Sequence, residues 1–361
     1  MKIRIVGVVV GVLLLCNNAH AQLSRKKSHH NERRMATFQG VRRSFSDKAY
    51  NSFGFSINGL NYFGDLAPLS RKASTDISFT RPGFAFSWIR RMGPRYSLQT
   101  QFMWGTLSAS DQSADPGDEA GHYRHLRNLS FRNQIKELSV IGYFDLFRNQ
   151  ATYMRRVRWT PYVYGGLAVF LHNPQAMAPM TYLDGSPNPS GGNWVNLHDL
   201  GTEGQYAKLS SADVNYGIKP YSLVQVALPV GAGVRFRVND LVDIWADIGF
   251  RYTFTDYLDD VSQNYVDLGK LTSPLAQAMS YRTNELFNGN PPGGISSSLP
   301  GVSTLPGFGS EHHDNMRGFK GAKDMYMVTN IKITYIFGAH FYQGRLYTSR
   351  AVARAGTLIS K

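Results

Sequence analysis

Three short polar runs contain the residue types that bind metal ions or transfer protons. Run 311–314 is Glu-His-His-Asp, run 255–260 is Thr-Asp-Tyr-Leu-Asp-Asp, and run 201–205 is Gly-Thr-Glu-Gly-Gln. Adjacent histidines lack the helical spacing that lets two imidazoles share one ion, so run 311–314 predicts a solvated loop rather than a metal site or an Asp/His pair. The carboxylates of run 255–260 suit calcium, but the EF-hand spacing is absent and a polar exit from a strand is favoured. Run 201–205 lacks the strand–loop–helix context of a phosphate site.

The composition limits which activities and which fold classes are compatible with the chain. There is no readable Ser/His/Asp arrangement, and Cys16 is the single cysteine. We therefore predict a protein that is not an enzyme and that needs no cofactor, metal ion or small-molecule substrate. Hydrophobic residues make up 42% of the chain and aromatic residues 13%, which is too rich for a disordered protein. A mean hydropathy of −0.28 excludes a bundle of membrane helices, each of which needs about 20 apolar residues.

The N-terminus predicts export. Lys2 and Arg4 precede the apolar run 5–15, and Ala-His-Ala at 19–21 is a cleavage site for a signal peptide spanning 1–21. The apolar run is too short to cross a bilayer. Lipidation of Cys16 is disfavoured because three leucines precede it, so cleavage leaves a chain without a thiol and without disulfides. An exported chain that enters a membrane without a helical span must do so as a closed barrel in the outer membrane of a Gram-negative bacterium.

Apolar and polar residues alternate, with a period of two, along much of the remaining chain. In 242–254, apolar side chains alternate with a set that includes Asp243, Asp247, Gly249 and Arg251. This is typical of a membrane strand with a lipid face and an inner face, whereas strands of soluble sandwiches average only five or six residues. Similar alternation predicts eight strands within 53–58, 84–88, 96–104, 129–144, 159–171, 223–238, 242–254 and 325–337.

The connections between these segments alternate in length. Short ones lie between the second and third, fourth and fifth, and sixth and seventh strands, and long ones lie elsewhere. This favours an all-β, eight-stranded antiparallel outer-membrane β-barrel over 49–340, with short periplasmic turns, long outer loops and both termini in the periplasm. A barrel of eight strands is filled by its own side chains. We therefore expect Asp243, Asp247 and Arg251 to lie in the lumen within a satisfied internal network, where opposite charges two or four residues apart can pair. We do not expect a metabolite channel.

The two ends of the mature chain are basic. Segment 22–48 predicts a periplasmic extension, and segment 341–361 predicts a periplasmic tail beyond the last strand. Nucleic acid is excluded as a partner because the chain is exported, which leaves anionic outer-membrane lipids, an acidic periplasmic protein, or solvated ends. The predicted partner-binding residues are Arg25, Lys26, Lys27, Arg33, Arg34, Arg350 and Arg354.

Several segments, taken in order, resemble one known family. They are Asn-Tyr-Phe-Gly-Asp-Leu at 61–66, Arg-Asn-Leu-Ser-Phe-Arg at 127–132, Glu-Leu-Ser at 137–139, Thr-Pro-Tyr-Val at 160–163, Asn-Pro at 173–174, Leu-Gly-Thr-Glu-Gly-Gln at 200–205, Thr-Asp-Tyr-Leu-Asp-Asp-Val-Ser at 255–262, Arg-Gly at 317–318 and Lys-Asp at 323–324. In this order they look like the PorG-type outer-membrane β-barrel subunit of the type IX secretion system, over about 53–337.

The resemblance implies a role that periodicity does not. Members of this family are outer-membrane barrels that associate with a periplasmic ring lipoprotein and its partner subunits. They serve protein export and, in some bacteria, gliding motility, and the family has no catalytic residues to transfer. Two alternatives remain open: a stand-alone small barrel whose external loops bind a ligand or mediate adhesion, and a barrel enzyme at the outer rim.

Overall fold

The computed structural model describes residues 49–66, 80–149, 153 and 156–337. The chain divides into two compact units, 1–47 and 48–361, and every described residue belongs to the second. The predicted signal peptide, basic extension and basic tail lie outside the described residues, and so do all seven predicted partner-binding residues, Arg25, Lys26, Lys27, Arg33, Arg34, Arg350 and Arg354.

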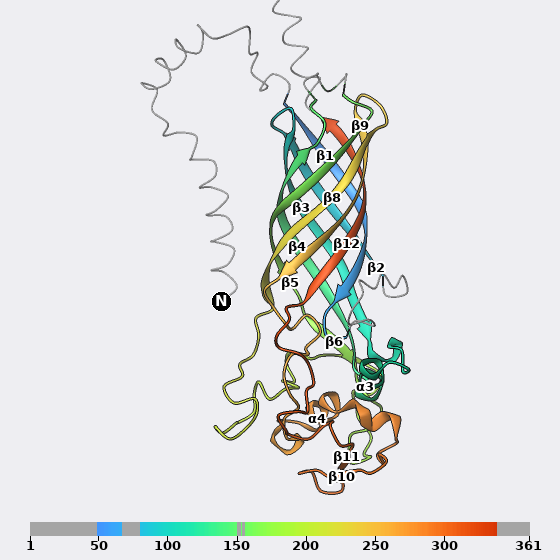
Figure 1. Ribbon diagram of the computed structural model, residues 1–361, viewed down its shortest axis with the longest axis vertical. Helices are drawn as coiled ribbons and strands as arrows, with labels where there is room; N and C mark the ends of the chain where they lie inside the picture. The colour runs from blue at the N-terminus through green and yellow to red at the C-terminus, as the bar shows by residue number, and fades with distance from the viewer. Residues whose placement is uncertain (1–48, 67–79, 150–152, 154–155, 338–361) are drawn as a thin grey trace, which may run out of the picture. The chain divides into compact units, whose positions relative to one another are not determined.

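Eight long antiparallel strands form the described unit, as the alternation predicts (Figure 1). They are β1 (Tyr50–Phe63), β2 (Arg81–Arg91), β3 (Tyr96–Ser110), β4 (Ser130–Asp145), β5 (Trp159–Leu171), β8 (Val224–Arg237), β9 (Val242–Thr253) and β12 (Met325–Phe337). Each pairs with the next, and β12 pairs with β1 from Phe63↔Met325 to Asn51↔Phe337, which closes the barrel. Closure gives every strand two partners, so no edge is left unpaired in lipid.

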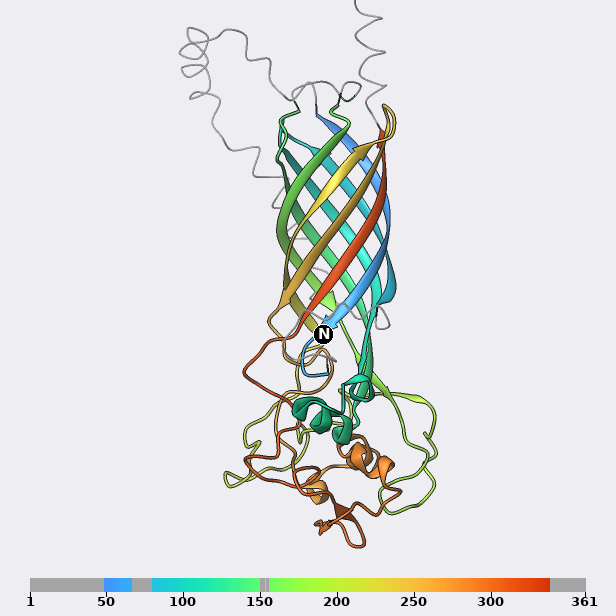
Figure 2. The same cartoon turned by 45° about the vertical axis from the view of Figure 1, so that its right-hand side comes forward.

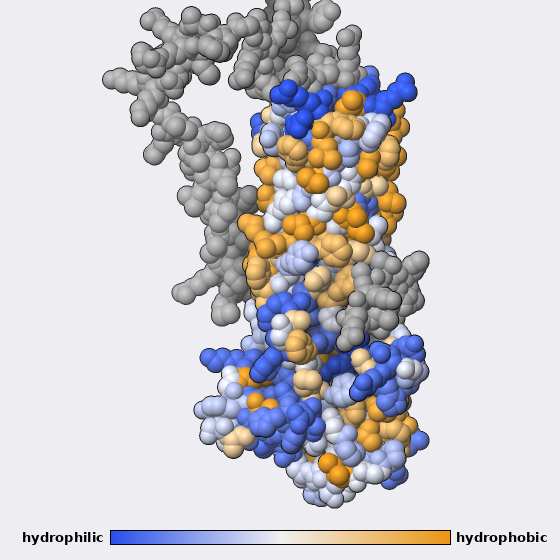
Figure 3. Space-filling view, in the orientation of Figure 1, coloured by the Kyte–Doolittle hydropathy of each residue, from blue (hydrophilic) through white to orange (hydrophobic). Residues whose placement is uncertain are grey.

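The side chains of each strand divide between the two faces of the wall. On β9, Ile244, Ile248 and Tyr252 are exposed outward, whereas Asp243 and Asp247 are buried inside. Apolar side chains gather over the strands and polar ones over the loops (Figure 3). This outward band is what a hydrocarbon environment requires, and the fold is that of a transmembrane β-barrel. Among the residues described, no helix is long and apolar enough to cross a bilayer.

The connections also follow the predicted alternation. The described residues of the short connections 92–95, 146–158 and 238–241 lie at one end of the barrel. The described residues of the long connections 64–80, 111–129, 172–223 and 254–324 gather at the other (Figure 2). We call the described residues of the four long connections the outer layer. It contains short elements only: η3 (Asp111–Ser113), α3 (Glu119–Arg127), β6 (Pro174–Met177), β7 (Trp194–Asn196), η5 (Leu268–Lys270), α4 (Pro274–Ser280), η6 (Arg282–Leu286), β10 (Ile295–Ser296) and β11 (Ser303–Thr304).

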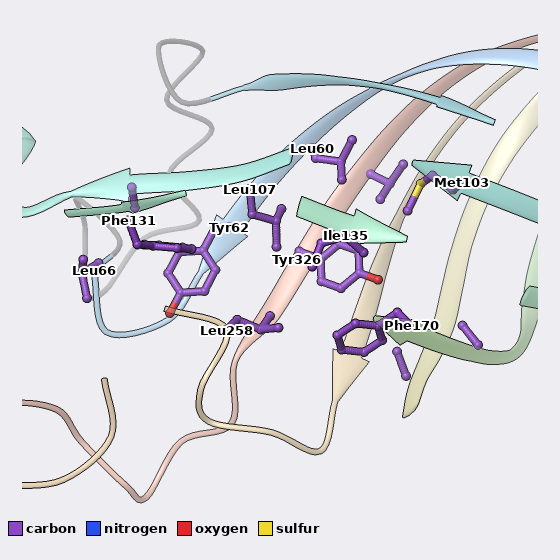
Figure 4. Close-up of a cluster of buried hydrophobic side chains, with 14 of the residues drawn as sticks. Leu60, Tyr62, Leu66, Met103, Leu107, Phe131, Ile135, Phe170, Leu258 and Tyr326 are labelled. Atoms are coloured by element: carbon purple, nitrogen blue, oxygen red, sulfur yellow. The ribbon is translucent and has the colours of Figure 1, made fainter. Parts of the chain in front are cut away.

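Apolar side chains fill the half of the lumen next to the outer layer (Figure 4). Leu60, Met103, Ile135 and Phe170 are fully buried, and Leu258 from connection 254–324 packs into the same cluster. Burying one such side chain contributes about 1.5–3 kcal/mol. The outer layer therefore shares a core with the barrel, which fixes the loops to its mouth.

Charged, polar and aromatic side chains occupy the rest of the lumen, and the charged ones have partners that differ from those predicted. Asp243 accepts from Arg156 at 2.7 Å, and Arg251 lies 3.6 Å from Glu137. The third residue, Asp247, accepts from two tyrosine hydroxyls, at 2.8 Å and 3.2 Å. The expected place of the three residues inside the barrel, within a polar network, is confirmed, but each has partners other than the two residues named with it. Inward positions on one strand are about 6.6 Å apart for each step of two residues, so partners reaching from other strands come closer.

Two adjacent glycines on β5 differ in how closely the wall packs around them. A Cβ at Gly166 would lie 2.2 Å from the Val140 carbonyl oxygen and 2.8 Å from the Ile141 Cα, so the backbone would have to move. At Gly165 the nearest atom would be 3.8 Å away. We expect Gly166→Ala to lower the free energy of unfolding by about 1–3 kcal/mol and Gly165→Ala to change it by less than about 0.5 kcal/mol. Urea unfolding of refolded protein in micelles measures both; equal losses would contradict this packing.

Candidate functional site

A buried polar network lies where the barrel meets the outer layer. We call it the mouth network and define it as Tyr62, Asp111, Arg127, Glu203, Asp259, Asp260, Arg317 and Asp324. These residues come from β1, β3–β4, β5–β8 and β9–β12, and most lie in the segments that carry the family resemblance. Segments far apart in sequence therefore meet at one place.

Arg317 is at the centre of the first part of this network. Its guanidinium donates to Glu203 Oε1 at 3.0 Å and to the Asp260 carbonyl oxygen at 2.6 Å. A second nitrogen lies 3.7 Å from the Asp260 carboxylate, and only 2% of the arginine side chain is exposed. Thr202 and Tyr221 donate hydroxyl hydrogen bonds to Asp260 at 2.5 Å and 2.7 Å. Connections 172–223 and 254–324 are thereby joined by a desolvated ion pair.

Two buried carboxyl groups share one tyrosine in the second part. The Tyr62 hydroxyl oxygen lies 2.7 Å from Asp259 Oδ2 and 2.7 Å from Asp324 Oδ1. A phenol has one hydrogen and can donate to only one of these oxygens. The other contact becomes a hydrogen bond when that carboxyl group is protonated and donates to the phenol. The geometry thus favours a neutral carboxylic acid at one of the two aspartates.

Arg127, at the end of α3, joins the remaining connections. It binds Asp111 through two nitrogens, both at 2.8 Å, in the forked geometry that favours arginine–carboxylate pairs. It also donates to the backbone oxygens of Arg317 and Asp65, at 2.5 Å and 3.0 Å. Asn128, with a φ of 59°, ends the helix in the left-handed conformation and turns the chain into β4.

Burial controls the protonation of the mouth network. It raises the pKa of Glu203 to about 7, against the opposing effect of Arg317. It likewise raises the pKa of Asp260, and it raises the pKa of Asp259 and of Asp324 well above the usual range, with mutual repulsion adding to the shift at Asp259. Removing a carboxylate from water penalises its charged form, which is why the pKa of each of these four carboxyl groups is raised.

These shifts predict that the outer layer is more stable in mild acid. Between pH 4.5, where an ordinary glutamate titrates, and about pH 7, folded Glu203 holds a proton that the unfolded chain releases. Stability therefore falls as the pH rises through this window, by roughly 3 kcal/mol for this group alone. Hydrogen exchange of the outer layer, corrected for the intrinsic rate, should be slower at pH 5 than at pH 8, and Glu203→Gln should reduce the difference. Equal protection at both values would contradict the raised pKa.

The three polar runs noted in the sequence occupy different environments in the structure. In 311–314, His312 and Asp314 are exposed and 3.5 Å apart, while Glu311 pairs with Lys270 at 2.8 Å. Within the described part of the chain, no group of three His, Cys, Asp or Glu side chains is placed to hold a metal ion. Runs 201–205 and 255–260 instead supply the mouth network. Sequence reasoning weighed those runs separately and named Arg317 only within the family resemblance, because nothing local indicates its partners.

A separate cavity of about 340 Å³ opens in the outer layer. It lies between residues 179–185 and 278–301, and its lining includes Tyr182, Asp184 and Glu285. Glu285 is held by two hydrogen bonds from Arg282, at 2.6 Å and 3.0 Å. The side-chain oxygen of Asn284 is buried there without a hydrogen-bond partner. Carboxylates, amides and a tyrosine ring in one hollow suit a polar ligand.

Comparisons with known proteins give a family match and several structural likenesses. A family model described as a domain of unknown function, DUF6089, matches residues 35–184. No curated protein sequence matches the chain. Three structural likenesses involve outer-membrane or surface proteins. The attachment invasion locus protein Ail of Yersinia pestis is 8% identical, with a TM-score of 0.29 and coverage of 80% of this chain and 97% of that one.

The other two are similarly distant. Neisserial surface protein A is 9% identical, with a TM-score of 0.31 and coverage of 80% and 96%. A major outer membrane protein from Thermus thermophilus is 10% identical, with a TM-score of 0.31 and coverage of 80% and 99%. At these scores the fold assignment depends on this chain's own strand register, which closes between β12 and β1.

Proposed function

We propose that the protein is a non-enzymatic outer-membrane barrel of the type IX secretion machinery that anchors a periplasmic ring complex at the membrane. The observation that carries the anchoring role is the filled lumen. Glu137, Asp145, Arg251 and Lys332 are buried inside the barrel, where charged and apolar side chains occupy the space that a solute path would need. The secretion role comes from the resemblance of segments 61–66 to 323–324 to the PorG-type family.

The docking surface in this proposal is the pair of basic ends. Export through a signal peptide would place Arg25, Lys26, Lys27, Arg33, Arg34, Arg350 and Arg354 in the periplasm, at the end of the barrel with the short turns. One exposed charge pair contributes only about 0–1 kcal/mol. Several basic residues would therefore act together on an acidic ring subunit, and the association should weaken in salt.

Affinity purification from mildly solubilised outer membranes tests this role. A ring lipoprotein and its partner should co-purify at low salt and dissociate at high salt, and substitution of the seven basic residues by serine should abolish their recovery. Lys208, Lys219 and Lys320 are exposed outer-layer lysines, and their replacement by serine is compared with a variant in which only Arg25, Lys26 and Lys27 are replaced, so that each variant loses three positive charges. Recovery of the barrel alone from unmodified cells at both salt concentrations would overturn the secretion role.

The outer-layer cavity favours a second candidate, a small barrel that binds an external ligand or surface. Asp184 and Asn290 line this cavity, and both are exposed. Under this alternative, Asp184→Ala with Asn290→Ala should reduce adhesion of cells that display the protein and should leave recovery of ring subunits unchanged. Unchanged adhesion in the double variant would count against the alternative.

A further inference from the structure

A cluster of basic side chains lies on the outward wall of the barrel beside the outer layer. Register pairs Arg132 of β4 with Ser108 of β3, and Lys136 with Trp104. Arg81, at the start of β2, donates from Nε to the same Ser108 hydroxyl at 2.8 Å. We call Arg81, Arg132 and Lys136 the basic rim. Arg132 and Lys136 therefore share the outward face of β4. Arg81 stands opposite the inward-facing Leu60 in the register, and its guanidinium reaches the outward side through the bond to Ser108. No acidic residue stands among the three in the strand register.

The basic rim lies at the level where the apolar band ends. Along the outward face of β4, Val140 and Leu138 are exposed apolar residues, and the next outward positions toward the outer layer are Lys136, Gln134 and Arg132. Leu138 pairs with Phe102 and Val169 on the neighbouring strands, both of which are also exposed. The change from apolar to cationic side chains places the rim at the lipid headgroups of the outer leaflet.

The guanidinium of Arg132 is oriented by the two short strands that extend from β4. It stacks on the Trp194 ring of β7, with 3.8 Å from its central carbon to the ring centroid. Its Nε donates to Gln175 of β6 at 3.1 Å. Among the described residues, no hydrogen bond or ion pair engages the terminal nitrogens of Arg132 or Arg81, and no carboxylate pairs with Lys136. The forked ends of both arginines therefore remain available for an anion.

A cavity of about 190 Å³ adjoins the rim. It is lined by Lys136 together with the side chains of Gln134, Leu171, His172, Asn173 and Gln175. Three of these residues carry amides, which can both donate to and accept from hydroxyl groups. The cavity thus places three amide groups, which can bind sugar hydroxyls, next to the cations of the basic rim. The apolar Leu171 lies beside them on the lipid-facing wall.

We propose that the basic rim binds the phosphate groups of a phosphorylated glycolipid of the outer leaflet. The arginine forks match phosphate oxygens in a two-point geometry that an ammonium group lacks. Arg132 and Lys136 are four residues apart on one strand, or about 13 Å, so they engage different phosphates of one headgroup. The amide-lined cavity receives its sugar hydroxyls, and the acyl chains lie along Leu138 and Val140. This inference is independent of the proposed secretion role.

Native mass spectrometry of the purified full-length protein tests the proposal with diphosphorylated lipid A, dephosphorylated lipid A and inorganic phosphate as probes. The diphosphorylated lipid should bind most tightly, and removal of its phosphates should weaken binding by about a thousandfold, or roughly tenfold for each of the three cations. Inorganic phosphate at the same concentration should not displace it. Equal binding of the two lipids would overturn the proposal, and displacement by inorganic phosphate would point to a free-anion site instead.

Serine replacement of Arg81, Arg132 and Lys136 together should reproduce the loss of about a thousandfold. The matched control replaces Arg90, Arg148 and Arg158, three exposed arginines at the opposite end of the barrel. An equal loss in the control would show that binding depends on net charge alone and would overturn the assignment. Heat-dependent electrophoretic migration reports folding of each variant. If the triple variant does not fold, Arg81→Ser and Lys136→Ser singly should each weaken binding by about tenfold, and no loss in either would overturn the proposal.

Discussion

Replacement of Arg317 by leucine is expected to lower the stability of the outer layer by about 3–5 kcal/mol. The substitution leaves Glu203 and Asp260, both fully buried, without their cation. The amides of Ser262 and Gln263 report this loss directly, because both donate to Glu203 Oε1, at 2.9 Å and 3.1 Å. Their hydrogen exchange should accelerate by at least about a hundredfold, while exchange in the middle of the barrel strands stays slow.

Lys270 provides the control for this variant. It also pairs with two carboxylates, Asp213 at 2.7 Å and Glu311 at 2.8 Å, but 33% of its side chain is exposed. Because solvent screens such pairs, Lys270→Ala should cost no more than about 1 kcal/mol. The Arg317→Leu defect should shrink at pH 5, where the orphaned carboxyl groups take up protons. If the two variants exchange alike at pH 8, the mouth network does not hold the outer layer in place.

Replacement of Asp145 by leucine should destabilise the barrel itself by about 3–5 kcal/mol. Asp145 Oδ2 is the shared acceptor of Arg91 and Arg235, the latter at 2.5 Å, and the carboxylate is fully buried. Its loss leaves two buried guanidinium groups near the end of the lumen that faces the short turns. Urea unfolding followed by tryptophan fluorescence should show the loss, since Trp245 lies 4.8 Å from the Arg235 guanidinium.

Asp240 supplies the comparison for this second substitution. It forms an ion pair with Arg237, but 57% of the aspartate side chain is exposed. Asp240→Ala should therefore change the free energy of unfolding by at most about 1 kcal/mol. A loss in Asp145→Leu that is no greater than in Asp240→Ala would mean that the lumen is more hydrated than the buried pairs indicate.

The filled lumen and the attached outer layer both bear on the two candidate roles. The lumen is occupied by side chains, and the outer layer is fastened to the barrel through Arg127, Arg317 and the Tyr62 carboxyl pair. A rigid outer layer suits both candidate roles: it closes the top of an anchor, or it presents a formed cavity to an external ligand. The ring-recovery and adhesion experiments distinguish them because the first depends on the basic ends and the second on connections 172–223 and 254–324.

The sequence by itself determined the barrel. A period of two is a local pattern. Because a strand between lipid and a narrow lumen must alternate apolar and polar side chains at successive positions, β9 could be predicted from 242–254 alone. The alternation of short and long connections then fixed antiparallel order and the end at which the loops gather. The alternation within strands and the lengths of the connections both depend on residues close together in the sequence. They can therefore be recognised without knowledge of any distant contact.

Only the tertiary structure decided which polar residues meet. Glu203 and Arg317 are separated by 114 positions and lie in connections without any period, so no pattern links them. A pair along its own strand was open to Asp243, yet it binds Arg156 from the short connection 146–158, because a side chain at the same end of the barrel comes closer than the next inward positions on one strand. The basic rim has the same origin. Arg132 stands opposite Ser108 through cross-strand register, which backbone hydrogen bonding between strands sets and local sequence does not reveal. Arg81 reaches the same serine with a side-chain hydrogen bond.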